Sequence, residues 1–296
     1  MSHATDEIAT QPACWAAAAD LAAGVARSLP APGERVAAVG CGTSYNMAQA
    51  YACLREEAGA AFTDAIPASE TVWGRRHYDR ILFLSRSGTT TEVLDALDRV
   101  PRGTPTVAIT ADPDTPIVEA AGTAVLLDFA DEASVVQTRF ATSALVLLRA
   151  HLGQDVGPLV DQAKRAVDAP LPSGALDATR FTFLGHGWTV GLAHEGALKL
   201  REAAQAWTES YPGMEVRHGP ISVIDGNSLV WCLGPAPGGL AADLSPTGTR
   251  WVQSELDPLA DLVRVQRLAV ELAVSRDLDP DRPRNLERSV ILPGGH

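Results

Sequence analysis

The sequence has few aromatic residues, few cysteines and no long apolar run, and each shortage excludes a class of protein. Aromatic residues are 5% of the 296 positions, so we expect a mainly aliphatic core among alanine-rich helices. The longest early apolar run, residues 14–26, contains Asp20 and is too short to cross a bilayer. The four cysteines form no CxxC pair, so we predict no metal site, no disulfide framework, no membrane partner and a cytoplasmic location.

Basic residues are also scarce, because 24 Lys and Arg stand against 36 Asp and Glu, for a formal net charge of −12. A protein that binds the phosphate backbone of a nucleic acid needs a basic face, so we expect no nucleic-acid partner. A small phosphate ligand is still compatible with this charge, since backbone N–H groups and hydroxyls can hold one phosphate. The composition therefore favours a small-molecule partner.

Short apolar segments typical of strands alternate with helical segments along the chain. This alternation predicts an α/β fold with parallel, doubly wound sheets. A Gly- and Pro-rich connection, residues 153–173, divides the sequence into expected domains at residues 1–157 and 158–296. The expected strands are residues 35–40, 62–66, 80–84, 105–109, 124–127, 180–184 and 229–233, and the main expected helices are residues 7–29, 43–57, 91–99, 134–152, 189–206 and 257–276.

The two halves contain a weak internal repeat. Gly40-Cys41-Gly42 and Gly185-His186-Gly187 lie 145 residues apart, and each follows a predicted strand and precedes a predicted helix. This suggests a duplicated fold of two tandem domains. The repeat does not extend to the hydroxyl-rich segment at residues 85–91, which has no counterpart in the second half.

Small hydroxyl residues gather at two predicted strand-to-helix turns of the first half, Gly42-Thr43-Ser44 and residues 85–91. Ligands of parallel sheets bind at the carboxyl ends of strands, where helix N-termini offer free backbone N–H groups. These turns suit a phosphate monoester, although Ser and Thr can also serve only as helix caps. No lysine follows Gly88 as in a nucleotide-binding P-loop, and we predict no cofactor.

Glu195, Lys199 and Glu202 are spaced four and three residues apart, which places them on one stripe of a helix. The stripe is either a solvated face with an ion pair or a group for acid–base chemistry. His218 lies in Arg217-His218-Gly219-Pro220, a turn sequence. Its near-neutral pKa suits proton transfer, but a loop histidine can equally be structural or merely exposed.

Together these residues resemble the sugar isomerase (SIS) family, and within it the isomerase half of glucosamine-6-phosphate synthase. Five motifs follow one another in family order over almost the whole chain. They are Cys41-Gly42-Thr43-Ser44-Tyr45-Asn46, Ser85-Arg86-Ser87-Gly88-Thr89-Thr90, Glu195-Gly196-Ala197-Leu198-Lys199-Leu200-Arg201-Glu202, Arg217-His218-Gly219-Pro220 and Asp281-Arg282-Pro283-Arg284-Asn285-Leu286.

The resemblance implies flavodoxin-like SIS domains and a role for each matching residue. Glu202 matches the base that moves a proton between C1 and C2 of a sugar, and Glu195 and Lys199 match its polar support. His218 matches a ring-opening residue that comes from the neighbouring subunit, so a homodimer is expected. The residues expected to contact the sugar phosphate are Gly42, Thr43, Ser44, Ser85, Arg86, Ser87, Thr90 and Val135.

The sequence departs from the synthase at three functional positions. Arg288 stands where the synthase has a Schiff-base lysine, and a guanidinium cannot form that imine. Arg86 stands where the second phosphate loop has Gln; it either pairs with phosphate or points into an ion pair. Position 2 is Ser2, not the nucleophilic cysteine of a glutaminase domain, so we expect no ammonia release from glutamine by this chain.

These observations favour a phosphosugar-processing enzyme, an aldose–ketose isomerase or an aminosugar-phosphate deaminase acting on a substrate such as glucosamine 6-phosphate or fructose 6-phosphate. Ketoamine-phosphate deglycation would use the same proton shuttle. A sugar-phosphate sensor without turnover remains the alternative, because fold does not fix function and the Schiff-base lysine is missing. An unrelated dinucleotide-binding oxidoreductase is disfavoured, because Gly40 and Gly42 lack the third glycine of that fingerprint.

Overall fold

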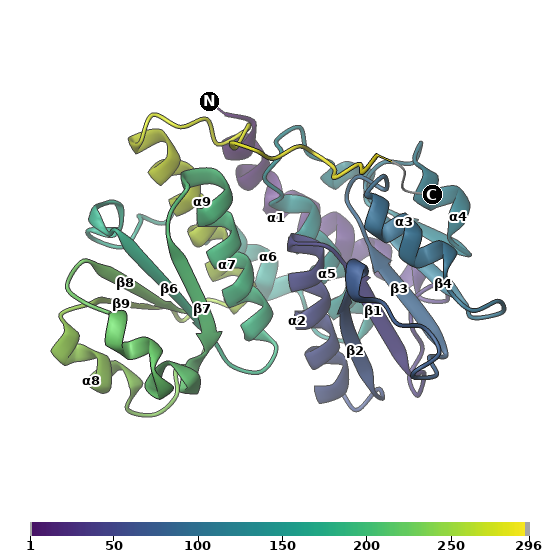
Figure 1. Ribbon diagram of the computed structural model, residues 1–296, viewed down its shortest axis with the longest axis horizontal. Helices are drawn as coiled ribbons and strands as arrows, with labels where there is room; N and C mark the ends of the chain where they lie inside the picture. Colours follow the sequence, from purple (N-terminus) through teal and green to yellow (C-terminus); the bar gives the residue numbers. More distant parts are fainter. Residues whose placement is uncertain (1, 294–296) are drawn as a thin grey trace. The chain divides into compact units, whose positions relative to one another are not determined.

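The computed structural model describes residues 2–293 and divides into two compact units (Figure 1). The first unit comprises residues 13–132, 137–157 and 287–293, and the second comprises residues 2–12, 133–136 and 158–286. The chain passes from one unit to the other after Gly157, and three further segments lie outside the unit that holds their neighbours in sequence. The start of the chain and residues 133–136 group with the second unit, and the end of the chain groups with the first.

The first unit contains a five-stranded sheet in the order β2-β1-β3-β4-β5, and every neighbouring pair is parallel. Helices connect three of the four successive strand pairs, and a short 3-10 helix lies between β2 and β3. After β1 the chain adds β2 on one side of the sheet, and it then returns to add β3 on the other side of β1. The carboxyl ends of β1 and β3 are therefore the switch point, where ligands bind in such sheets. The elements are β1 (Val36–Gly40), α2 (Thr43–Glu57), β2 (Thr63–Pro67), β3 (Arg80–Leu84), α3 (Thr91–Asp98), β4 (Thr106–Thr110), α4 (Pro116–Ala120), β5 (Thr123–Leu126) and α5 (Arg139–His151).

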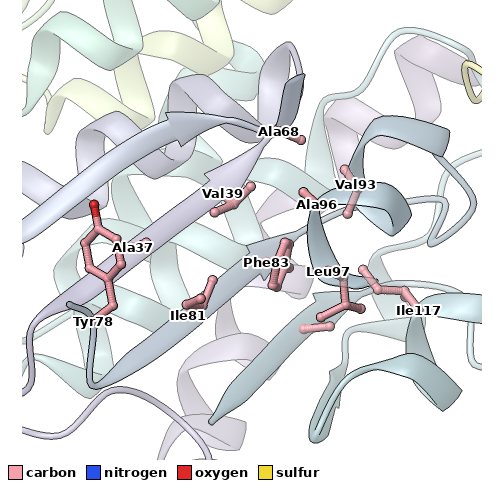
Figure 2. Close-up of a cluster of buried hydrophobic side chains, with 11 residues drawn as sticks. Ala37, Val39, Ala68, Tyr78, Ile81, Phe83, Val93, Ala96, Leu97 and Ile117 are labelled. Carbon is pink, nitrogen blue, oxygen red and sulfur yellow. The ribbon is translucent and has the colours of Figure 1, made fainter. Parts of the chain in front are cut away.

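The apolar core of the first unit follows the two-residue period of its strands. Ala37 and Val39 on β1 and Ile81 and Phe83 on β3 form one buried cluster with side chains from α3 and α4 (Figure 2). The intervening strand residues face the other side, where α2 packs on β1 and against α5. As expected from the composition, aliphatic residues and alanine make up most of this cluster.

The second unit has a four-stranded parallel sheet in the order β7-β6-β8-β9. Two helices, α7 and α9, pack on each other beside it, and Gly196 of α7 lies against Phe183 and Val265. The elements are α6 (Gly157–Asp168), β6 (Arg180–Gly185), α7 (Thr189–Ala204), β7 (Thr208–Pro212), β8 (Ser228–Cys232), α8 (Leu240–Leu244), β9 (Arg250–Gln253) and α9 (Pro258–Ser275).

The repeated glycines have the same steric role in each unit. A Cβ on Gly40 would lie 2.7 Å from the backbone carbon of Ser44, and one on Gly185 would lie 2.3 Å from the carbonyl oxygen of Thr189. In both places the following helix approaches the end of its strand too closely for any side chain. The internal repeat found in the sequence therefore marks two equivalent strand-to-helix turns.

Several elements differ from the sequence-based expectation; the short helices α4 and α8, for example, were not predicted. The helix predicted to begin at Ser134 begins at Arg139, because the Glu132 carboxylate accepts hydrogen bonds from the backbone N–H groups of Thr138 and Arg139. The short strands β7 and β9 were not predicted; both lie at sheet edges and have few buried positions. Short edge strands carry weak apolar patterns.

The first helix, α1 (His3–Val25), continues through Pro12. Proline lacks an N–H, so the carbonyl of Ile8 loses its usual helical partner. The side-chain amide of Gln11 donates to that carbonyl at 3.4 Å and also bonds Gln266 at 2.7 Å. The two compact units divide directly after this proline.

Among residues 2–293, no helix is long and apolar enough to span a bilayer. In the same range, no three His, Cys, Asp or Glu side chains are grouped closely enough to hold a metal ion.

Candidate functional site

The first hydroxyl turn, Gly42-Thr43-Ser44, follows β1 in the first unit. Gly42 has φ +51° and ψ −122° and precedes α2, while Thr43 and Ser44 are buried. Few non-glycine residues adopt a positive φ, so Gly42 fixes the direction in which α2 begins. The backbone N–H of Ser44 donates to Cys41 at 3.0 Å, which closes the turn.

The second hydroxyl turn, residues 85–91 and hereafter the hydroxyl loop, follows β3, the strand beside β1. Ser85 accepts a hydrogen bond from the backbone N–H of Gly88 at 3.2 Å, and Ser87 accepts one from Thr89 at 3.4 Å. Gly88 has φ +63°, and a Cβ there would lie 2.2 Å from Thr115 Oγ1. Glycine is therefore required at this turn.

The N-cap residues of the two helices that follow these turns make no side-chain cap hydrogen bond. These residues are Gly42 for α2 and Thr90 for α3. Thr90 Oγ1 instead lies 3.4 Å from Ser87 Oγ. The reading of Thr90 as an ordinary cap is therefore wrong for this loop.

The tail segment, residues 287–293, lies on the hydroxyl loop. The hydroxyl groups of Thr89, Ser87 and Thr90 all contact the Oγ of Ser289, at 2.9, 3.3 and 3.4 Å. The backbone N–H of Thr91, in the first turn of α3, donates to the Val290 carbonyl at 3.1 Å. Three hydroxyls and a helix N-terminus are thus satisfied by oxygens of the tail segment.

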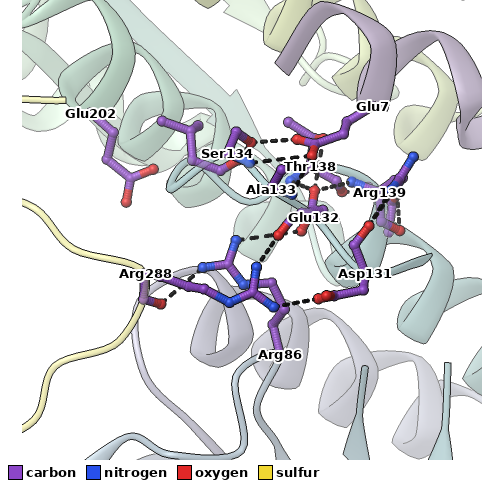
Figure 3. A network of polar contacts seen from close by, with 12 residues as sticks. Glu7, Arg86, Asp131, Glu132, Ala133, Ser134, Thr138, Arg139, Glu202 and Arg288 are labelled. Carbon is purple, nitrogen blue, oxygen red and sulfur yellow. Dashed lines mark hydrogen bonds and ion pairs between the residues drawn. The ribbon is translucent and has the colours of Figure 1, made fainter. Parts of the chain in front are cut away.

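Arg86 of the hydroxyl loop and Arg288 of the tail segment lie beside the carboxylates of Asp131 and Glu132 (Figure 3). Arg86 is 1% exposed; its guanidinium lies 3.9 Å from the buried Glu132 carboxylate and donates to the Arg288 carbonyl at 2.9 Å. Arg288 donates to Asp131 Oδ1 at 2.6 Å and to the Glu132 carbonyl. The Arg86 guanidinium therefore lies at ion-pair distance from Glu132, and its contact with phosphate stays a prediction.

The acid–base stripe of Glu195, Lys199 and Glu202 lies on α7 in the second unit. Lys199 and Glu195 are each 1% exposed and their charged atoms are 3.3 Å apart. Lys199 also donates to Glu202 Oε2 at 2.5 Å, while the Glu202 side chain is 19% exposed. The interpretation as a solvated face is therefore wrong for two of the three residues, because only Glu202 reaches solvent.

Glu202 opens into a hollow of about 420 Å³ at the end of α7. Its Oε1 accepts no hydrogen bond from the described residues, in contrast to Oε2. Two guanidinium groups and two side-chain amides share this hollow, hereafter the Glu202 hollow, with three apolar residues. The full lining is Leu198, Arg201, Glu202, Gln205, Ala206, Arg284, Asn285 and Leu286.

The remaining predicted residues are spread over both units. Arg288 lies in the first unit with the two hydroxyl turns, and His218 and Val135 lie in the second unit with the stripe. His218 is exposed at the end of a short 3-10 helix, Gly213–His218, and does not line the Glu202 hollow. The Val135 backbone N–H donates to the Asp281 carbonyl at 3.0 Å.

Sequence reasoning missed two residues of the site, Ser289 and Glu132. Ser289 lies about 200 residues from its partners, and nothing in its local sequence signals that contact. Glu132 gave a weaker signal, because it is a carboxylate just before a predicted helix. Its burial depends on tertiary packing and could not be predicted from the sequence.

Comparison with known proteins identifies similar sequences and similar folds. Residues 31–152, which include both hydroxyl turns, match the model of the SIS domain. The isomerizing glutamine–fructose-6-phosphate aminotransferase of Methanothermobacter thermautotrophicus is 27% identical over 88% of this chain and 52% of its own length. Isomerizing glutamine–fructose-6-phosphate aminotransferase 1 of Arabidopsis thaliana is 28% identical over 87% of this chain and 46% of its own length. The chain spans about half the length of these relatives.

Solved structures share the fold over nearly the whole chain. Glucosamine-6-phosphate deaminase from Thermotoga maritima gives a TM-score of 0.81 at 24% identity and covers 98% of this chain and 100% of its own. Tagatose-6-phosphate ketose/aldose isomerase from Escherichia coli gives 0.79 at 18% identity and covers 100% and 97%. The C-terminal domain of glucosamine-fructose-6-phosphate aminotransferase from Francisella tularensis gives 0.75 at 21% identity and covers 96% and 98%.

Proposed function

We propose that this chain is a phosphosugar isomerase or aminosugar-phosphate deaminase that moves a proton between C1 and C2 of a hexose 6-phosphate. In this proposal the hydroxyl loop, with Thr43 and Ser44, holds the phosphate ester. Glu202 is the base that transfers the proton, and Lys199 and Glu195 position it. His218 assists ring opening.

The observation that carries the proposal is the convergence of three hydroxyls on a single oxygen atom. Ser87, Thr89 and Thr90 all contact Ser289 Oγ within 3.4 Å, at the N-terminus of α3. Hydroxyls and N–H groups arranged around one oxygen are what an anionic phosphate oxygen requires. We interpret the Ser289 hydroxyl as standing at the position that a phosphate oxygen takes.

The contacts of the Glu202 carboxylate support its role as the base. The Lys199 ammonium holds one carboxylate oxygen and leaves the other facing the hollow. A carboxylate fixed on one side and open on the other can accept and return a proton without rotating. Glu195, buried against Lys199, in turn keeps the ammonium in place.

With glucosamine 6-phosphate as substrate, the proposed reaction is a deamination that consumes one water molecule. After ring opening, the C1 aldehyde acidifies the C2–H bond, and Glu202 removes that proton to give an enolamine. Return of the proton to C1 gives the C2 imine, and water hydrolyses the imine to fructose 6-phosphate and ammonia. The isomerase reaction uses the same steps with a hydroxyl at C2, so no imine forms and nothing is released.

Turnover and proton transfer test the base. Purified protein is incubated with glucosamine 6-phosphate or fructose 6-phosphate, and ammonia, product sugar and exchange of the substrate C–H with D₂O are measured. We expect Glu202→Gln to lower each rate by about 10²–10⁴-fold. Glu215→Gln, which alters an exposed carboxylate of the same unit, is the matched control. Equal rates in Glu202→Gln and wild type would refute the role of Glu202.

A second candidate, a sugar-phosphate sensor, is favoured by one observation. The guanidinium of Arg288, at the position of the imine-forming lysine, is bonded to Asp131 and to the Glu132 carbonyl. Saturable binding of sugar phosphates without turnover or hydrogen exchange would support the sensor over the enzyme.

A further inference from the structure

The turn that carries His218, residues 213–218 and hereafter the His218 turn, is packed against other parts of its own unit. Val216 is fully buried in an apolar cluster that also contains Leu240 of α8. A Cβ on Gly213 would lie 3.0 Å from the ring of Pro237, so the backbone of the turn passes close to that residue. The turn is therefore held at two points before it reaches His218, whose own side chain is exposed.

Arg217, the residue directly before His218, is held by all three nitrogens of its guanidinium. Its Nε and Nη2 contact Asp243 Oδ2 at 2.7 and 2.6 Å. Nη2 also donates to the Gly238 carbonyl at 2.9 Å, and Nη1 donates to the sulfur of Met214 at 3.0 Å. Because the Asp243 side chain is 48% exposed, this ion pair contributes little to stability. It fixes where Arg217, and with it the end of the His218 turn, lies relative to α8.

Arg217 and Gly213 both contact residues 234–239, hereafter the β8 loop. The two sheets have the same order for their first four strands, so β8 takes the place that β3 has in the first unit. The loop after β3 is the hydroxyl loop. The β8 loop contains only glycine, alanine and proline, so it offers a phosphate no side-chain donor. Its contacts are with the His218 turn instead, and the two equivalent loops therefore have different partners.

We propose that Arg217 and Asp243 are positioning residues that, together with the β8 loop, hold His218 in the orientation for opening the sugar ring. This inference rests on the proposed function and adds two residues to its ring-opening step. When cyclic fructose 6-phosphate opens, the C2–O5 bond breaks, O5 gains a proton, and the C2 hydroxyl loses its proton to become the carbonyl. His218 relays this proton, which requires the imidazole to lie within hydrogen-bond reach of the sugar. In this proposal neither Arg217 nor Asp243 touches the substrate, and a shift of the turn by about 1 Å slows ring opening alone.

Two ketose phosphates separate ring opening from the proton transfer that follows it. Fructose 6-phosphate is mostly cyclic, whereas 5-deoxyfructose 6-phosphate has no O5 and its O6 is esterified, so it stays open. Exchange of the C1–H with D₂O gives kcat for both. We expect Asp243→Ala and Arg217→Met each to lower kcat about 10- to 100-fold with fructose 6-phosphate, and to leave kcat for the open substrate within about twofold of wild type. The double variant should lose no more than either single variant, because both residues act through one contact.

The chain offers a matched control in Arg180→Met, because Arg180 forms another exposed ion pair of the same unit, with Asp225 at 3.1 Å. This variant should leave both rates unchanged. Equal losses with the two substrates, or no loss with fructose 6-phosphate, would overturn the inference. Exchange of only the open substrate by wild type would also overturn it, while the role of Glu202 in proton transfer would stand.

Failure of the proposed function itself would give a different result, because wild type would then exchange the C1–H of neither substrate. Hydrogen–deuterium exchange of the backbone amides decides in that case whether the ion pair fixes the turn. Asp243→Ala should speed exchange at residues 213–219 by about tenfold, since local opening becomes easier, and Arg180→Met should not. Unchanged exchange at these residues would overturn the positioning role.

Discussion

The acid–base stripe shows what residue spacing can and cannot predict. Intervals of four and three residues place Glu195, Lys199 and Glu202 on one side of α7, as the sequence indicated. Spacing could not reveal that Glu195 and Lys199 are buried while Glu202 is open. That difference depends on the helices packed around α7, which are far away in sequence.

Because this ion pair is buried, we predict that removing its cation lowers the stability of the protein strongly. Lys199→Met leaves the Glu195 carboxylate buried without its counterion, so we expect the free energy of unfolding to fall by about 3–5 kcal/mol. Urea unfolding measures this change. Lys164→Met is the control, because Lys164 forms an exposed pair with Asp161 and should cost less than about 1 kcal/mol. Equal losses would show that Lys199 is not a buried counterion.

The thiol of Cys41, next to the first hydroxyl turn, is predicted to be unreactive. Burial, and to a lesser extent the charge of Glu92, raises its pKa to about 11. At pH 8 only about one thiol in a thousand is then ionised. We expect slow alkylation by iodoacetamide at pH 8, rising about tenfold with each pH unit until pH 11. Mass spectrometry of the Cys41 peptide measures this, and rapid labelling at pH 7 would contradict it.

At the scale of elements, the sequence predicted the strands that carry the site but not the segment that lies on it. Apolar patterns identified β1 and β3, and the glycines after them located the turns. The tail segment has no such pattern, and its contact with the hydroxyl loop joins positions about 200 residues apart. Contacts of this kind depend on tertiary packing and leave no periodic signal.

We predict that the tail segment competes with phosphate for the hydroxyl loop. If Ser289 Oγ stands where a phosphate oxygen binds, Ser289→Ala removes a competitor that forms three hydroxyl contacts. We expect glucosamine 6-phosphate and inorganic phosphate to bind about three- to tenfold more tightly, the value of a net hydroxyl hydrogen bond. Isothermal titration calorimetry measures both, with Ser254→Ala as the control. Weaker binding would instead make Ser289 a phosphate ligand.

Removing hydroxyls from the hydroxyl loop should have the opposite effect and weaken phosphate binding. Ser87→Ala and Thr90→Val remove donors that we assign to phosphate, so each should weaken glucosamine 6-phosphate binding about five- to tenfold. Binding of unphosphorylated glucosamine should not change. Ser69→Ala, an exposed serine of the same unit, provides the matched control. An equal effect on the two sugars would mean that these hydroxyls do not contact the phosphate.

At the scale of the whole molecule, both sheets have the same order for their first four strands, and Gly40 and Gly185 have the same steric role. The alternation of strands and helices predicted parallel sheets correctly. The weaker edge strands of the second unit escaped prediction because their residues are only partly buried. Hydroxyl residues follow β3 but not its equivalent β8, so the two units are not chemically equivalent.

His218 leads to a prediction about assembly. Its side chain is exposed, and it is not among the residues of the Glu202 hollow. If His218 completes the site of a neighbouring subunit, the chain works as a homodimer, and two inactive variants should complement each other. Random exchange of Glu202→Gln and His218→Ala subunits makes half of the dimers mixed, each with one intact site, so about a quarter of wild-type activity should return.

The complementation has an internal control. Mixing Glu202→Gln with the Glu202→Gln/His218→Ala double variant can form no intact site, because every subunit lacks the base, and should restore nothing. Light scattering at micromolar concentration gives the assembly state independently. A fully active monomer, or His218→Ala activity equal to wild type, would show that His218 acts on no neighbour. Its exposure would then be that of an ordinary surface histidine, and each chain would carry out catalysis alone.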